Sequence, residues 1–205
     1  MKNLTIFDAL NRIVEASDGD IVLAPPASQS ELAALENCLQ RPVPDEIVEY
    51  LSVANGETRE SSGLFGCDDR LLGAEQIAIA IGDHESDEYQ IKSDDDLDRK
   101  CQFAQTGRTW HKMWIPIVYG YHSTGAYFDC QPTEKGRFGQ IVMSAPIDGD
   151  FGIAAVSIRD LFNRVLFLEP REELLVYYPF IDPNTGKIIV GANRYYERES
   201  HRHDG

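Results

Sequence analysis

The feature that most constrains the fold is a change in the spacing of apolar residues along the chain. In the first third they recur at helical spacing, whereas after Trp110 they form runs of strand length separated by short, turn-rich connections. Connections this short join antiparallel neighbours, because a parallel crossover needs a dozen or more residues. The runs cover residues 114–119, 126–130, 139–143 and 151–156. The sequence therefore predicts an α+β fold with a mostly antiparallel sheet.

Helices are expected before and after this sheet. Residues 4–15 carry a helical apolar stripe, and the spacing of Ser28 and Glu31 predicts a capping box at the start of a second helix. A proline corner separates this helix from a third helix, which is expected to end at Gly56 in the left-handed conformation that glycine favours. These two helices are expected to pack as a pair. A closing helix is predicted over residues 157–168.

The stretch between the third helix and the sheet gives mixed signals. Residues 63–66 and 71–72 resemble short strand pieces, and residues 74–81 fit either a helix or a strand. Residues 83–100 contain eight acidic and three basic residues and almost no apolar pattern. Their net charge of −5 is a third of that of the whole chain, so we interpret them as a solvated loop or insertion.

The sequence after residue 170 is interpreted as a separate unit. Apolar runs at 176–181 and 187–190 flank Asp182 to Gly186, a turn sequence typical of a β-hairpin. The polar end of the chain is expected to be disordered. The predicted organisation is a main domain over residues 1–170 with an acidic insertion at about 83–100, a C-terminal β-hairpin extension over 171–196, and a tail over 197–205.

The net charge of −15 over 205 residues argues against two classes of partner. Nucleic acids and anionic membrane surfaces both attract basic proteins and repel acidic ones. A basic protein partner remains compatible with this charge. The four cysteines are widely spaced without a C-x-x-C pair, and no apolar run approaches the roughly 20 residues of a membrane span. A cytoplasmic protein is therefore expected.

The sequence contains no recognisable catalytic or metal-binding motif. It has no Gly-rich phosphate loop, no G-x-S-x-G and no H-E-x-x-H. A nucleophile could be built from Cys130, His122 and Asp129, but Asp129 and Cys130 are neighbours on a predicted strand and point to opposite faces. A core cysteine beside a solvated aspartate is the preferred interpretation. The acidic clusters lack the other ligand positions of a calcium loop. From the absence of these motifs together, we expect no enzyme, no cofactor and no metal.

Two ordered series of short motifs carry a family resemblance. The first consists of Leu23-Ala-Pro-Pro-Ala-Ser28, Glu31-Leu-Ala-Ala-Leu35, Arg41-Pro-Val-Pro-Asp45, Tyr50-Leu51 and Asn55-Gly56. The second consists of Trp114-Ile-Pro-Ile117, Tyr127-Phe-Asp129, Pro132 and Gly136-Arg-Phe-Gly-Gln140-Ile141. Together they resemble the SUKH superfamily, in particular the group related to the fungal Smi/Knr cell-wall-synthesis regulators. The matched positions span Leu23 to about Phe167.

The resemblance implies N-terminal helices beside a mostly antiparallel sheet, and function through protein binding. Bacterial members of the superfamily resemble immunity proteins that block polymorphic toxins, often nucleases, whereas fungal members resemble regulatory hubs of cell-wall signalling. The leading hypothesis is a non-enzymatic immunity protein that occludes the active site of a basic cognate toxin. The alternative is a regulatory scaffold without a toxin partner.

The matched motif residues are expected to be structural, and Asp129 to cap backbone groups in the loop through Pro132. They are Pro26, Gly56, Trp114, Pro116, Asp129, Pro132, Gly136 and Gly139. The acidic insertion lies outside the motifs and is the predicted surface that steers a basic partner. Its candidate partner-binding residues are Glu85, Asp87, Glu88, Asp94, Asp95, Asp96 and Asp98.

Overall fold

A five-stranded antiparallel sheet lies at the centre of the fold. The computed structural model describes residues 3–65, 69–86, 111–119, 125–145, 150–167, 180–181 and 188–189. The strands of the sheet are β1 (Arg70–Leu71), β2 (Trp114–Tyr119), β3 (Gly125–Asp129), β4 (Ile141–Ala145) and β5 (Asp150–Ala155). They follow one another in chain order, and every neighbouring pair is antiparallel. This meander confirms the α+β fold class.

The middle of β2 contains an irregularity next to a proline. Pro116 lies opposite Tyr127, and the register with β3 shifts between Pro116 and Val118. A proline has no N–H for the ladder, so sheets tolerate it at bulges and at edges. Strand β1 pairs only with Val118 and Tyr119, beyond the bulge. The proline therefore lies beside the irregularity and outside the part of β2 that pairs with β1.

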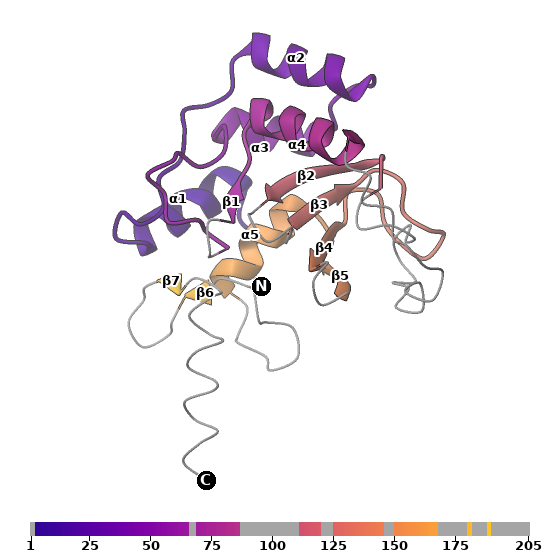
Figure 1. Ribbon diagram of the computed structural model, residues 1–205. Helices are drawn as coiled ribbons and strands as arrows, with labels where there is room; N and C mark the ends of the chain where they lie inside the picture. Colours follow the sequence, from indigo (N-terminus) through magenta and orange to yellow (C-terminus); the bar gives the residue numbers. More distant parts are fainter. Residues whose placement is uncertain are drawn as a thin grey trace.

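The helices form layers beside the sheet (Figure 1). They are α1 (Ile6–Ala16), α2 (Gln29–Leu39), α3 (Asp45–Val53), α4 (Ala74–Ser86) and α5 (Ile158–Phe167). In Figure 1, α2 is the outermost helix, and α3 and α4 lie between it and the strands. Helix α2 packs mainly on α4, and α4 packs on β2. The expected pairing of α2 with α3 is thus minor, since α4 occupies the position beside α2.

Side-chain caps fix the start of three helices. The Ser28 hydroxyl accepts the Glu31 N–H at 3.3 Å, and Glu31 Oε2 accepts the Ser28 N–H at 2.7 Å, which completes the predicted capping box. These hydrogen bonds hold the pKa of Glu31 below its ordinary value. Thr5 caps α1, and Ser157 accepts the Asp160 N–H at the start of α5.

Two of the predicted segments take a different form. Residues 63–65 of the expected strand piece 63–66 lie in an irregular turn. Segment 74–81, whose sequence fits either a helix or a strand, is helical. Helix α4 continues to Ser86, so the loop predicted from residue 83 begins later. Residues 87–100 of the acidic insertion lie outside the described residues.

The sheet is buried on both faces. On one face, Ile115, Phe128 and Ile141 join the main core with the helices. On the other, Trp114, Tyr127 and Val142 form a smaller cluster in which the Trp114 and Tyr127 rings are 5.5 Å apart. Strands that are buried on both faces read as continuous apolar runs, which explains the runs seen in the sequence.

Near the C-terminus, strands β6 (Phe180–Ile181) and β7 (Ile188–Ile189) pair antiparallel. They are shorter than the predicted runs 176–181 and 187–190. Helix α5 contacts β6. The residues between the two strands, for which the sequence predicts a turn, and those after β7 lie outside the described residues.

Asn163 on α5 anchors the start of the chain. Its amide accepts the Leu4 N–H at 2.9 Å and donates to the Leu4 carbonyl at 3.0 Å, and the residue is only 3% exposed. Because Asn163→Ala leaves these partly buried backbone groups without the amide that pairs with them, we expect it to lower the free energy of unfolding by about 2 kcal/mol. Urea denaturation measures this change. The exposed Asn37→Ala is the control, and an equal loss in both variants would contradict the anchoring role.

Candidate functional site

The predicted partner-binding acids fall almost entirely outside the described part of the chain. Glu85 lies in the last turn of α4. Asp87, Glu88, Asp94, Asp95, Asp96 and Asp98 lie outside the described residues. Their role in steering a partner therefore stays a prediction.

The motif residues of the sheet meet where β2 and β3 pair. Trp114 lies opposite Asp129, and Pro116 lies opposite Tyr127. Trp114 is fully buried. Gly139 has a φ of +83° and is buried, and the Gly136 N–H donates to the Thr133 carbonyl to close a turn. Pro132 is half-buried in this connection.

Asp129 is buried, contrary to the expected solvated position. Its Oδ1 accepts the Gln131 N–H at 2.9 Å, and its Oδ2 accepts from Gln140 Nε2 at 2.9 Å. The Asp129 N–H donates to the Gln140 carbonyl at 3.0 Å. A buried carboxylate needs such partners, and Gln140 supplies one from eleven residues away. The side chain therefore ties the β3–β4 connection to the end of β3.

The chemistry of Cys130 does not favour a nucleophile. The pKa of the thiol is raised to about 11, chiefly by burial, while Arg41 lowers it and Asp129 raises it by smaller amounts. A nucleophilic cysteine needs the thiolate form near neutral pH. His122, the candidate base, lies outside the described residues.

The first series of motifs converges on a tight backbone contact. Pro26 is exposed, and the carbonyl of the preceding Pro25 accepts the Asn55 N–H at 3.2 Å. The Asn55 side chain donates to Glu31 and accepts the Ala74 N–H, which ties the start of α2 to the start of α4. Gly56 has a φ of +81° and lies against the backbone of residues 71–73.

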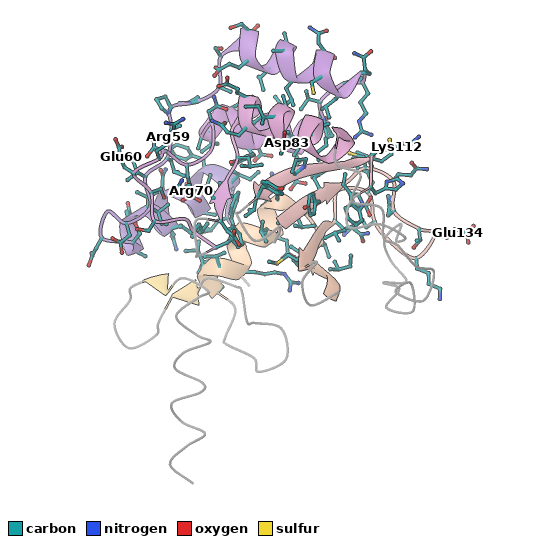
Figure 2. The ribbon with its side chains drawn as sticks, viewed as in Figure 1. Arg59, Glu60, Arg70, Asp83, Lys112 and Glu134 are labelled. Atoms are coloured by element: carbon teal, nitrogen blue, oxygen red, sulfur yellow. The ribbon has the colours of Figure 1, made fainter. Side chains whose placement is uncertain are left out.

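Glu57 is a half-buried carboxylate that the sequence pattern does not reveal. It accepts the Leu71 N–H at 2.8 Å, the Leu64 N–H at 3.2 Å and the Ser61 hydroxyl. Burial raises its pKa, and these hydrogen bonds together with Arg70 oppose the rise. Figure 2 shows Arg70 with Arg59 and Glu60 on the side of the fold opposite Lys112 and Glu134. Two of its three hydrogen-bond donors are backbone N–H groups, which every residue type except proline carries, so no residue pattern in the sequence predicts this site.

An acidic cleft lies where α3 and α5 begin. It has a volume of about 660 Å³, and we name it the α3–α5 cleft. Its lining residues are Asn3, Asp45, Glu46, Glu49, Val156, Ser157, Arg159, Asp160 and Asn163. It thus contains four carboxylates and one guanidinium group. No single motif could reveal it, because its two walls are more than 100 residues apart in the sequence.

Arg159 spans the α3–α5 cleft. Its Nη2 donates to both carboxylate oxygens of Glu49 at 3.1 Å, and its main-chain N–H donates to Glu46 Oε1 at 3.0 Å. Asp160 pairs with Arg164 at 2.7 Å. These contacts hold Glu46, Glu49 and Asp160 in place, and Asp45 and Glu46 leave an excess of negative charge along the cleft walls.

The described residues show neither a metal site nor a membrane span. Within them, no group of three or more histidine, cysteine or acidic side chains could hold a metal ion. Of the helices that the structure describes, none has the length and apolar character to cross a bilayer.

Comparison with known proteins identifies the family. The SMI1 / KNR4 family (SUKH-1) matches residues 26–164, which include α2, α3, α4, the five-stranded sheet and most of α5. A search of curated proteins found no significant match. The family match covers well over half of the sequence and agrees with the observed order of helices, antiparallel sheet and closing helix. The chain therefore belongs to the SMI1 / KNR4 (SUKH-1) family.

Proposed function

We propose that this protein is an immunity-type protein that binds a cognate toxin and blocks its active site without catalysing a reaction. The observation that carries the proposal is the family match over residues 26–164, because the family supports an immunity or SMI1 / KNR4-type role and is generally non-catalytic. The net charge of −15 favours a basic partner. A nuclease-type toxin has a basic cleft for nucleic acid, and an acidic protein is complementary to it.

Occlusion requires only a stable complex. Opposite charges raise the rate of association, and apolar side chains in the interface then slow dissociation. In this proposal the protein acts in the cytoplasm and covers the active site of the toxin, so substrate is excluded by steric overlap.

Co-expression with each adjacent gene tests the proposed function. We expect one neighbouring product to arrest growth alone, and this protein to restore growth and to co-purify with that product. Failure with every adjacent open reading frame would contradict the immunity role.

The acidic insertion gives a kinetic prediction. Neutralising Glu85, Asp87, Glu88, Asp94, Asp95, Asp96 and Asp98 as glutamine or asparagine should slow association with the toxin about tenfold or more at low salt, and should flatten the salt dependence. Stopped-flow measurement at several salt concentrations gives both values. The matched control neutralises seven exposed acids elsewhere, namely Glu15, Asp18, Asp20, Glu36, Glu60, Glu75 and Glu134. An equal effect in both variants would show that net charge, rather than this segment, steers the partner.

The alternative is a regulatory scaffold of the cell-wall-signalling type, which the same family match supports. The two functions differ in their partner. A scaffold would co-purify with proteins of cell-wall synthesis and would not relieve the toxicity of any neighbouring product.

A further inference from the structure

The connection between β3 and β4 holds an exposed aromatic side chain in a fixed position. Phe138 is 61% exposed and packs edge-on against Phe128, with the ring centroids 5.6 Å apart. The next residue, Gly139, donates its N–H to the Asp129 carbonyl at 2.9 Å. The Arg137 N–H donates to Gln140 Oε1 at 3.0 Å. An exposed ring that is already held in place loses little side-chain entropy on binding, so it can act as a binding anchor.

The turn that carries Phe138 lies against the α3–α5 cleft. A methyl group built on Gly139 would lie 3.7 Å from Glu46 Oε2, a side chain of the cleft wall. Val156, which is 44% exposed, also lines the cleft. Ala155, the residue before Val156, ends β5 and pairs with Ile141, the first residue of β4 after the turn. Phe138 and Val156 therefore add exposed apolar surface to the cleft.

The charges of the cleft define the chemistry of the group that it would hold. Arg159 is paired with Glu49 and Arg164 with Asp160, so the excess negative charge of the cleft comes from Asp45 and Glu46. A cationic side chain is therefore attracted to the cleft and an anionic one is repelled. An apolar side chain beside that cation would cover Phe138.

We propose that the α3–α5 cleft, with Phe138 and Val156 at its rim, is the docking surface for a basic segment of the protein partner. In the complex an arginine or lysine enters the cleft, and an adjacent apolar residue packs on Phe138. This inference rests on the proposed function and adds to it the surface that the partner contacts. It differs from the acidic insertion, which would act on association at a distance.

A defined peptide tests the chemistry with the full-length protein. The probe is a fluorescein-labelled heptapeptide that alternates leucine and arginine, and the matched peptide has glutamate in place of arginine. We expect the arginine peptide to bind about tenfold more tightly in fluorescence anisotropy at low salt.

Substitutions assign the binding to this surface. Phe138→Ala and the double variant Glu46→Gln with Glu49→Gln should each weaken binding about fivefold or more. Glutamine keeps the hydrogen-bonding oxygen on which Arg159 relies, and thermal denaturation confirms that each variant is folded. The matched controls are Phe7→Ala, which removes a ring that is 57% exposed on α1, and Glu36→Gln with Glu60→Gln. These should change the dissociation constant by less than about twofold.

Three results would overturn the docking surface. The first is an arginine peptide that does not bind, and the second is control variants that weaken binding as much as the cleft variants. The third is a dimer in sedimentation that Phe138→Ala dissociates, which would assign this face to a second copy of the chain.

Growth rescue separates this inference from the proposed function. If wild type and the cleft variants rescue growth equally, the surface is wrong and the immunity role stands. If wild type rescues nothing, the immunity role fails whatever the peptides show.

Discussion

Gly56→Ala is expected to lower the free energy of unfolding by about 4 kcal/mol, which is exceptional for a single methyl group. The residue has a φ of +81°, a conformation that costs alanine about 1–2 kcal/mol. The added Cβ would also lie 2.4 Å from the Gly73 nitrogen and 2.7 Å from the Leu71 oxygen. Both are backbone atoms, so no side-chain rotation relieves the overlap, and overpacking adds about 1–3 kcal/mol. Urea denaturation followed by circular dichroism measures the loss.

Three other glycines separate the two causes. Gly19→Ala has the conformational cost alone, because Gly19 has a φ of +94° and nothing within 4 Å of its Cβ position. Gly73→Ala has the overlap alone, with the Asn55 carbonyl oxygen at 2.4 Å. Gly82→Ala has neither cost and lies in helix α4, so it should stabilise the protein by about 0.5–1 kcal/mol. A loss for Gly56→Ala no larger than that for Gly19→Ala would show that the backbone contact yields easily.

The elements that the sequence predicts correctly are those specified by neighbouring residues. The capping box of Ser28 and Glu31 involves residues three apart, and the antiparallel meander follows from short connections between apolar runs. Such local signals need no knowledge of the tertiary structure. The segment 74–81 is different, because alternating alanine and isoleucine fit both a helix and a buried strand. In the folded chain this segment is helical and contacts α2 and β2.

The candidate site could be predicted far less well, because its parts come from distant segments. Glu49 on α3 and Arg159 on α5 are 110 residues apart and meet only in the folded chain. The burial of Asp129 depends on Gln140, whose position follows from the β3–β4 turn. Sequence patterns report which side chains are charged, but not which of them a fold brings together.

Glu57→Ala is expected to lower the free energy of unfolding by about 3 kcal/mol. The carboxylate is an acceptor for the Leu64 and Leu71 N–H groups and for the Ser61 hydroxyl, and it joins the turn after α3 to strand β1. Alanine leaves these donors without that acceptor, and each such buried group costs about 1–3 kcal/mol. For a chain of this length the melting temperature should fall by about 6–12 °C. Glu60→Ala, at an exposed position three residues away, should change it little.

The pH dependence of stability distinguishes the charge of Glu57 from its hydrogen bonds. Burial raises the pKa of Glu57 in the folded protein above the ordinary value of 4.5. The native state therefore binds the proton more readily than the unfolded state, so ionisation of this group destabilises the fold. As the pH falls from neutral through the raised pKa towards 4.5, wild type should gain stability from this residue, and below 4.5 the gain should level off.

Glu57→Gln cannot ionise and isolates this contribution. Glutamine retains one acceptor oxygen for the Leu71 N–H, and its amide can donate to the Ser61 hydroxyl oxygen, so the loss should be smaller than for alanine. The difference in unfolding free energy between wild type and Glu57→Gln should therefore shift in favour of wild type as the pH is lowered from 7.5 to about 4.5. Urea denaturation at matched ionic strength measures it. A difference that stays constant over this range would show that burial does not perturb the carboxyl group, and the effect of Glu57→Ala would then reflect hydrogen bonding alone.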